Sequence, residues 1–355
     1  MKRSTKAFLL SLLLVLVLCL GLTGCSQEQI TFVVPESKVP TITILAYHRI
    51  IDGGPSFIDV TPHMFDNQLS YLKDNGYNVI SYEELLSYLQ DKSPLPQKPV
   101  LITFDDGYKE TLTNAAPILA KHKMPATLFI YSDRLKSSES SGGLTVDELK
   151  ELQRLGWSIQ AHTISHADLS SFAPNNKEGA MRELVENKDL IEKSLGTEVT
   201  ALAYPYGAYT KEVEDWAKEA GYLTCFLIEE GPNNLNPNPY RLNRHMLYAK
   251  DTLEDFAHKV SSTPLEIIRT VPAQAQVINY RPATVIADIK LPQEVEVVKV
   301  FADLESQELK ARFDDKKQRI VVETPNISYG HKNLTVRILG NDGRSYIYGW
   351  SFVIR

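Results

Sequence analysis

The chain has 355 residues, enough for two domains after an N-terminal leader. It carries 38 Lys and Arg residues against 44 Asp and Glu residues, a formal charge of −6, and removing the three basic residues among the first six takes it to −9. An acidic chain of this kind is not expected to bind nucleic acid.

The N-terminus predicts secretion and a lipid anchor. Basic residues precede an unbroken apolar run over residues 7–18, which has the length of a secretory signal rather than of a membrane span. The run leads to LTGC at residues 22–25, which resembles the lipobox of bacterial lipoproteins. We therefore expect a signal peptide over residues 1–24, a lipid on Cys25 and a tether over residues 25–39. The protein would then lie on the extracellular face of the bacterial cell membrane; the alternative is an ordinary signal peptide cleaved nearby.

Cysteine usage agrees with that expectation. Cys19 lies in the signal and Cys25 at the anchor, which leaves Cys225 alone in the mature chain. No disulfide within the mature chain is then possible, although the compartment would allow one. Since Cys225 lies in the apolar run YLTCFLI, we expect it to be a buried small hydrophobic residue.

From residue 41 to about residue 228, apolar runs alternate with amphipathic helix patterns. Most runs are continuous, as expected for parallel strands buried on both faces. Capping residues mark helix starts, such as Thr61 before Pro62 and the pair Thr145 and Glu148. The seven runs in chain order are TITILAY, YNVI, PVLITF, PATLFIY, WSIQAH, VTALAY and YLTCFLI.

Seven strand-then-helix units in series predict an α/β fold with a parallel sheet and right-handed crossovers. We expect a distorted parallel (β/α) barrel of about seven strands over residues 40–263, with a doubly wound sheet as the alternative. Residues 264–355 instead show short alternating strands separated by turns, the pattern of a small β-sandwich. Their last strands resemble immunoglobulin-like or fibronectin-like modules, and Trp350 and Phe352 alternate there as core residues do.

Titratable and turn residues follow several of the predicted strands. In a parallel barrel the catalytic groups lie at the carboxyl ends of the strands, so these residues are expected to share one end. In chain order they are His48, Asp105 and Asp106, His162 and His166, Tyr204 to Gly207, and Arg244.

The segment HTISH predicts half of a metal site. His162 and His166 are four residues apart, which brings them together if they lie on a helical turn. The position of the base in the zinc-protease pattern is occupied by Thr163, so a carboxylate must come from elsewhere. The DDG turn offers two, one to bind the metal and one to remain free as a base. Two imidazoles and a carboxylate suit a divalent ion such as Zn²⁺.

The motifs TFDDG (103–107), HTISH (162–166) and AYPYG (203–207) resemble those of polysaccharide deacetylases of carbohydrate esterase family four. The resemblance covers about residues 41–250, and the form of the motifs is similar to that of the poly-N-acetylglucosamine deacetylase branch. It implies a metal-dependent hydrolase that removes N-acetyl groups from the amino sugars of a cell-surface polysaccharide such as poly-N-acetylglucosamine or peptidoglycan.

The resemblance also implies roles for the motif residues. Asp105 would be the general base, while Asp106, His162 and His166 would hold zinc or, in its place, cobalt, nickel or iron. Among the remaining residues, the backbone N–H of Tyr206 would stabilise an oxyanion, and His48 would be the general acid.

One position departs from the family pattern. Many members carry Arg where this chain has Ala203, and that Arg orients the base. Arg244, after the seventh strand, is the candidate replacement. Tyr204 and Pro205 are further candidates for binding the substrate or orienting the base.

Three alternatives remain at this stage. A non-catalytic glycan-binding lipoprotein would be expected to lack the base or a ligand, and this chain retains all four residues. An acetyl-ester esterase on the same scaffold would differ in its loops. An iron oxygenase also uses two His and one carboxylate, but it does not account for the second Asp beside the ligand.

Overall fold

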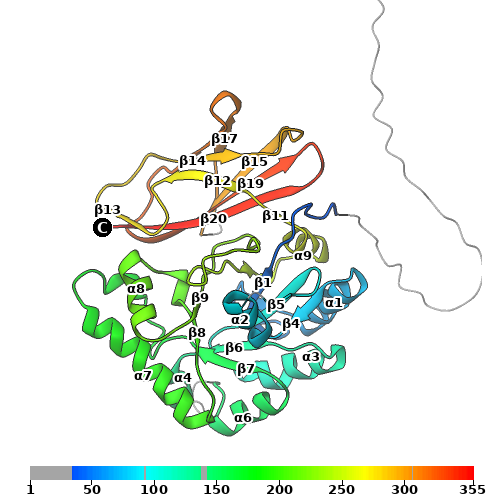
Figure 1. Cartoon of the computed structure of the whole chain (residues 1–355), viewed down its shortest axis with the longest axis vertical. Coiled ribbons are helices and arrows are strands. Elements are labelled where there is room, and N and C mark those ends of the chain that lie inside the picture. Colours follow the sequence, from blue (N-terminus) through cyan, green and yellow to red (C-terminus); the bar gives the residue numbers. More distant parts are fainter. Residues whose placement is uncertain (1–33, 92, 137–141, 306) are drawn as a thin grey trace, which may run out of the picture. The chain divides into compact units, whose positions relative to one another are not determined.

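The computed structural model describes residues 34–355, except residues 92, 137–141 and 306. The predicted signal peptide and Cys25 lie outside the described residues. An α/β region (residues 43–260) comes first and a C-terminal β region (residues 263–354) follows it (Figure 1). Within the described part of the chain, none of the helices has the length and apolar character needed to cross a membrane.

The α/β region is built on one sheet in which every strand pairing is parallel. Seven strands are neighbours in the order β10-β1-β5-β6-β7-β8-β9, and β4 pairs with β5. The strands are β1 (Thr43–Tyr47), β4 (Asn78–Ile80), β5 (Pro99–Phe104), β6 (Thr127–Ile130), β7 (Ser158–Ala161), β8 (Ala201–Ala203), β9 (Thr224–Phe226) and β10 (His245–Met246).

The strand order is that of a half-barrel. β10, the last strand of the region, pairs with β1, the first strand. On the other side of β1 the strands β5 to β9 follow in chain order. A doubly wound sheet would instead reverse its order in the middle. An isolated parallel bridge between Phe226 and Leu242 links β9 to the segment before β10. The barrel prediction is therefore confirmed at the level of an incompletely closed parallel barrel, and β10 is a strand that the sequence patterns missed.

Helices connect these strands and begin where the capping residues predict. Thr61 accepts a hydrogen bond from the N–H of Met64 at 3.1 Å, and Thr145 and Glu148 form a complete capping box. Two short strands, β2 (Arg49–Ile50) and β3 (Asp59–Val60), follow β1. The helices are α1 (Pro62–Asp74), α2 (Tyr82–Asp91), α3 (Ala116–His122), α4 (Ser132–Lys136), α6 (Val146–Arg154), α7 (Lys177–Leu195), α8 (Lys211–Glu219) and α9 (Leu253–Val260).

The parallel strands are buried on both faces, which explains their continuous apolar runs. One set of strand residues, such as Leu45 and Ile102, joins the large cluster that the outer helices cover. The alternate set, such as Ile44 and Leu101, forms a second cluster with Tyr82 at the start of α2. Cys225 has no exposed surface, and burial raises the pKa of its thiol to about 12, as expected for a structural cysteine.

The C-terminal β region consists of two sheets that share one core. Its alternating strands behave as predicted, because Leu334, Val336 and Ile338 are fully buried, and so are Trp350 and Phe352. The first sheet has the order β11 (Thr263–Pro264), β20 (Ser345–Ile354), β19 (Gly330–Gly340), β15 (Val297–Leu304) and β16 (Gln307–Leu309), with β13 (Gln276–Ile278) beside β20. The second has the order β12 (Glu266–Val271), β14 (Thr284–Lys290), β18 (Arg319–Glu323) and β17 (Ala311–Asp314). The immunoglobulin-like resemblance of this region stays a prediction.

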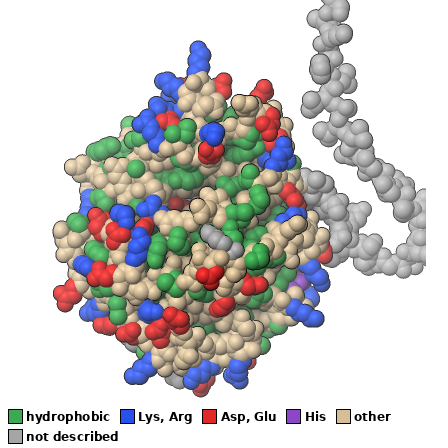
Figure 2. Space-filling view, in the orientation of Figure 1, with side chains coloured by type: hydrophobic (Ala, Val, Ile, Leu, Met, Phe, Trp, Pro, Cys, Tyr) green, Lys and Arg blue, Asp and Glu red, His purple; other side chains and the backbone are tan. Residues whose placement is uncertain are grey.

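Charged side chains of both signs are interspersed over the α/β region on the face drawn in Figure 2. Among the described residues of the α/β region, Lys177 forms an ion pair with Glu219 at 2.6 Å. The described residues on that face therefore produce no field of a single sign.

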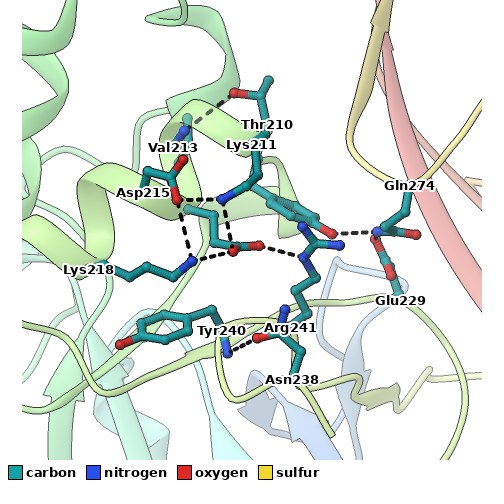
Figure 3. A network of polar contacts seen from close by, with 12 residues as sticks. Thr210, Lys211, Val213, Asp215, Lys218, Glu229, Asn238, Tyr240, Arg241 and Gln274 are labelled. Atoms are coloured by element: carbon teal, nitrogen blue, oxygen red, sulfur yellow. Dashed lines mark hydrogen bonds and ion pairs between the residues drawn. The ribbon is translucent and has the colours of Figure 1, made fainter.

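A partly buried set of polar contacts joins the two regions (Figure 3). Gln274, in the segment before β13, donates hydrogen bonds to Glu229, at 2.7 Å, and to Tyr209. The guanidinium of Arg241 lies 5.7 Å from the centroid of the Tyr209 ring and pairs with Glu214 at 2.5 Å. Burial raises the pKa of Glu229 to about 7. The two hydrogen bonds of Gln274 link the C-terminal β region to the α/β region, and the one to Glu229 reaches the segment between β9 and β10.

Candidate active site

A cleft of about 920 Å³ lies at the carboxyl ends of the parallel strands. Its lining includes the titratable residues that the motifs predicted, and it extends to residues of the C-terminal β region. The lining residues from the predicted set are His48, Asp105, Asp106, His162, His166 and Tyr206.

The turn after β5 points both carboxylates into the cleft. Asp105 continues the sheet, because its N–H donates to the carbonyl of Tyr47 at 3.0 Å. Asp106 and Gly107 then take the left-handed conformation, with φ values of 74° and 73°. Gly107 is required for a second reason, since a Cβ there would lie 2.9 Å from the Ile130 side chain. Successive side chains that would alternate along a strand are thereby brought to one side.

Asp106, His162 and His166 converge as a candidate metal site. Asp106 Oδ1 lies 3.6 Å from His162 Nε2 and 3.3 Å from His166 Nε2. This oxygen is buried and has no hydrogen-bond partner among the described residues. A buried carboxylate oxygen without a partner is costly unless a cation satisfies it. Two imidazoles and a carboxylate are donors that fit a divalent ion such as zinc.

The histidines are prepared to act as ligands. His162 Nδ1 donates to the carbonyl of Ala203 at 2.7 Å, so its proton is on Nδ1 and the lone pair of Nε2 faces Asp106. Burial lowers the pKa of His166 to about 4, which keeps that ring neutral at neutral pH. A neutral imidazole is the form that binds a metal.

The segment from His162 to His166 is not the helical turn that the four-residue spacing predicted. Thr163 and His166 have φ values of 69° and 60°, so the segment is a loop with two left-handed residues. Glu183 of α7 holds this loop, since one of its oxygens accepts the N–H groups of Ile164 at 2.9 Å and Ser165 at 3.0 Å. The helical expectation was wrong, yet the loop brings both Nε2 atoms to Asp106.

Asp105 is held by a buried arginine. Arg244, which has no exposed surface, makes two hydrogen bonds to the carboxylate, at 2.7 Å and 2.8 Å. Its Nε donates to the carbonyl of Leu227 at 2.7 Å, which fixes the guanidinium. Burial raises the pKa of Asp105, but the charges of Arg244, His162 and His48 lower it by a larger amount. The net pKa of Asp105 is therefore well below its ordinary value. Arg244 therefore contacts Asp105, and its role as the replacement for the arginine missing at Ala203 stays a prediction.

His48 and Tyr206 complete the cleft on the side of the α/β region. His48 Nδ1 is buried without a partner among the described residues, and burial lowers the pKa of the ring. Tyr206 has a φ of 60°, and its ring packs edge-on against His166, with centroids 4.6 Å apart. Tyr204 and Pro205 are both buried and do not line the cleft, and the Tyr204 ring stacks on Tyr209.

Comparison with known proteins agrees with this arrangement. The family model for polysaccharide deacetylases matches residues 92–225. A Bacillus subtilis protein, putative polysaccharide deacetylase YxkH, is 33% identical over 212 residues, which cover 59% of this chain and 73% of the relative. The Staphylococcus aureus poly-β-1,6-N-acetyl-D-glucosamine N-deacetylase is 30% identical over 206 residues, covering 55% and 69%. The solved Streptococcus pyogenes deacetylase PplD, in complex with acetate, is 29% identical with a TM-score of 0.58, covering 62% of this chain and 99% of that chain. The sequence match to the Bacillus subtilis relative, together with the family model, identifies the chain as a member of the polysaccharide deacetylase family.

Proposed function

We propose that this deacetylase hydrolyses the acetamide of N-acetylglucosamine units in a cell-surface polymer of the poly-β-1,6-linked kind. The relative from Staphylococcus aureus is named for that substrate. The observation that carries the proposal is the division of labour between adjacent carboxylates. Asp106 faces the two histidines, whereas Asp105 is paired with Arg244 and faces the same cleft.

The proposed metal ligands are Asp106, His162 and His166, with zinc as the proposed ion and cobalt, nickel or iron as others that the donors accept. When bound, such an ion supplies Lewis-acid polarisation of the acetamide carbonyl and lowers the pKa of water.

Two side chains of the protein carry out the proposed proton transfers, and a backbone N–H stabilises the negative oxygen. Asp105 is kept ionised by Arg244, so it can accept the proton of the attacking water as that water adds to the carbonyl carbon. The N–H groups of Gly207 and Ala208 are used within their own turn, and the Tyr206 N–H is the proposed donor to the negative oxygen. His48 delivers a proton to the nitrogen as the C–N bond breaks. The products are acetate and a free amine on the sugar.

The charge of the cleft supports a polymer without acidic groups. Among the lining residues, carboxylates outnumber Lys and Arg side chains by eight to three, and six carboxylates remain when Asp105, paired with Arg244, and the proposed metal ligand Asp106 are set aside. A cleft with this balance repels the carboxylates of peptidoglycan and its peptides, but it does not repel a neutral homopolymer. After deacetylation the product carries a positively charged amine, which the carboxylates of the cleft do not repel.

The proposed location follows from the leader alone. Residues 1–24 are the proposed signal peptide, and the lipid on Cys25 is the proposed anchor to the outer face of the cell membrane. Labelling cells with a radioactive fatty acid tests this proposal. Label is expected in the wild-type chain and not in the Cys25→Ser variant, and equal label in both would contradict it.

The substrate is tested by acetate release from a matched panel. The zinc-loaded full-length chain, purified in mild detergent, would be given poly-β-1,6-N-acetylglucosamine, β-1,4-linked N-acetylglucosamine oligomers, peptidoglycan and acetylated xylan. Acetate is expected mainly from the β-1,6-linked polymer. Release from acetylated xylan alone would favour the esterase alternative, and glycan binding without release of acetate would favour a binding protein.

A further inference from the structure

One strand of the C-terminal β region faces the catalytic cleft. In β19, Leu334, Val336 and Ile338 are buried in the core that the two C-terminal sheets share. The alternate residues of the strand line the cleft instead; they are His331, Asn333, Thr335 and Arg337. Because side chains alternate along a strand, one edge of the cleft is a continuous sheet face. We call this face the cleft wall; its main residues are Asp303, Tyr329, His331, Asn333, Thr335 and Arg337.

The neighbouring strand extends the wall in register. Asp303 of β15 is paired with Thr335 of β19, so both side chains lie on the same side of the sheet. Across β19, Ile347 of β20 pairs with Arg337 and also lines the cleft. The wall is therefore a surface of three strands.

Close contacts hold the wall in place. Asn333 Nδ2 donates to the carbonyl of Ile228, just after β9, at 3.0 Å. At Gly349 of β20, a Cβ would lie 2.7 Å from the backbone nitrogen of Glu230, so only glycine allows this approach. Further along, the N–H of Ala275 donates to the carbonyl of Ser351 at 2.8 Å. A wall fixed at several points can position a ligand accurately.

The wall also presents polar and aromatic side chains to the cleft. His331 Nε2 and Asn333 Oδ1 are buried, and neither has a hydrogen-bond partner among the described residues. Buried polar atoms are normally satisfied, and these two belong to residues that line the cleft, so a ligand with hydroxyl or amide groups is a candidate partner for both side chains. Tyr329, whose ring centroid lies 4.8 Å from the guanidinium of Arg281, is 60% exposed as a residue, and Tyr206, which lines the same cleft, is 58% exposed. Exposed rings in a concave site are suited to an amphipathic ligand such as a sugar.

We propose that the C-terminal β region binds the polysaccharide, with the cleft wall holding sugar units that flank the one being deacetylated. The proposal rests on the proposed function, because the wall and the metal triad belong to the same cleft. The occupant is the polymer itself rather than a partner protein, because the wall lines the cleft in which the reaction is proposed. Tyr329 would stack on a sugar ring, while His331 and Asn333 would bind its hydroxyl or acetamide groups.

The test is glycan binding in the absence of turnover. Zinc-loaded full-length protein carrying Asp105→Asn would be titrated calorimetrically with a pentamer of β-1,6-linked N-acetylglucosamine. Tyr329→Ala removes the exposed ring, and His331→Phe removes the unpartnered nitrogen while keeping a ring of similar size. The matched control is Tyr280→Ala, because Tyr280 lies in the same region, is 54% exposed and does not line the cleft.

The Kd of the pentamer is expected to rise about tenfold in each wall variant and to stay unchanged in the control. If the wall variants match the control, or if the pentamer fails to bind when the wall is intact, the proposal is overturned. The proposed function has a separate readout, which is acetate release by the wild-type chain from the same pentamer. Binding that depends on Tyr329, without any acetate release, would support the proposed glycan-binding role of the cleft wall and refute the proposed reaction.

Discussion

Replacing Arg244 by methionine should change both the stability and the pH dependence of this deacetylase. Arg244 is completely buried and makes two hydrogen bonds to Asp105, which is itself 2% exposed. Removing one member of such a pair leaves a buried charge uncompensated, at a cost on the order of 3–5 kcal/mol. Methionine keeps much of the volume of the side chain, so the loss of stability reflects the missing charge rather than a new cavity.

The sign of the pH effect follows from the pKa of Asp105. In the wild type this pKa is below its ordinary value of 3.8, so the ion pair contributes stability above that pH and loses it as the pH falls through the lowered pKa. Without Arg244, burial raises the pKa, and the ionised carboxylate then costs stability as the pH rises. The difference between wild type and variant in the free energy of unfolding should therefore be larger at pH 8 than at pH 5.

Two assays measure these effects. Urea unfolding at both pH values gives the stability difference, and kcat/KM between pH 5 and pH 9 gives the ionisation of the base. The variant is expected to lose activity as the pH falls through a range where the wild type keeps it. Arg241→Met is the matched control, because Arg241 lies in the same segment, pairs with Glu214 and does not line the cleft. An unchanged pH profile, with a stability loss no larger than in the control, would refute the role of Arg244.

Three other substitutions have defined outcomes. Glu183→Gln should weaken zinc binding about 10- to 100-fold, because Glu183 supports the ligand loop, and unchanged affinity in chelator competition would contradict that support. Glu229→Gln should stabilise the protein at pH 8 by on the order of 3 kcal/mol and much less at pH 5, since the raised pKa of Glu229 means that its ionised form costs stability as the pH rises through about 7. Equal effects on urea unfolding at the two pH values would show that Glu229 does not titrate there. His48→Gln should lower kcat by roughly 10²–10⁴ with the zinc content unchanged, and loss of zinc would argue against a role in proton transfer alone.

Much of the α/β region could be predicted because its signals are local. Continuous apolar runs identified seven strands, and capping residues such as Thr61 and Thr145 marked helix starts correctly. The short strand β10 was missed because two residues carry no pattern of their own. Its place is set by pairing with β1, at Leu45 and Ala46, a contact between the two ends of the region.

The site was predictable in its residue types but not in its supports. Motif spacing identified His162 and His166 and left the choice between Asp105 and Asp106 open, and the family resemblance implied Asp106. The spacing favoured a helical turn where the chain forms a loop. That loop depends on left-handed residues and on Glu183, which is 17 residues further along and has no motif signal. Nor does the alternation of β19 reveal what its polar face meets, because that depends on how the two regions pack.

The central claim is that adjacent carboxylates separate metal binding from proton transfer. The direct test measures zinc content and acetate release together for the wild type, Asp105→Asn and Asp106→Asn, with folding checked by circular dichroism. Both variants should release almost no acetate, while Asp105→Asn keeps one zinc per chain and Asp106→Asn loses it. Loss of zinc from both variants, or full activity in Asp105→Asn, would contradict the claim.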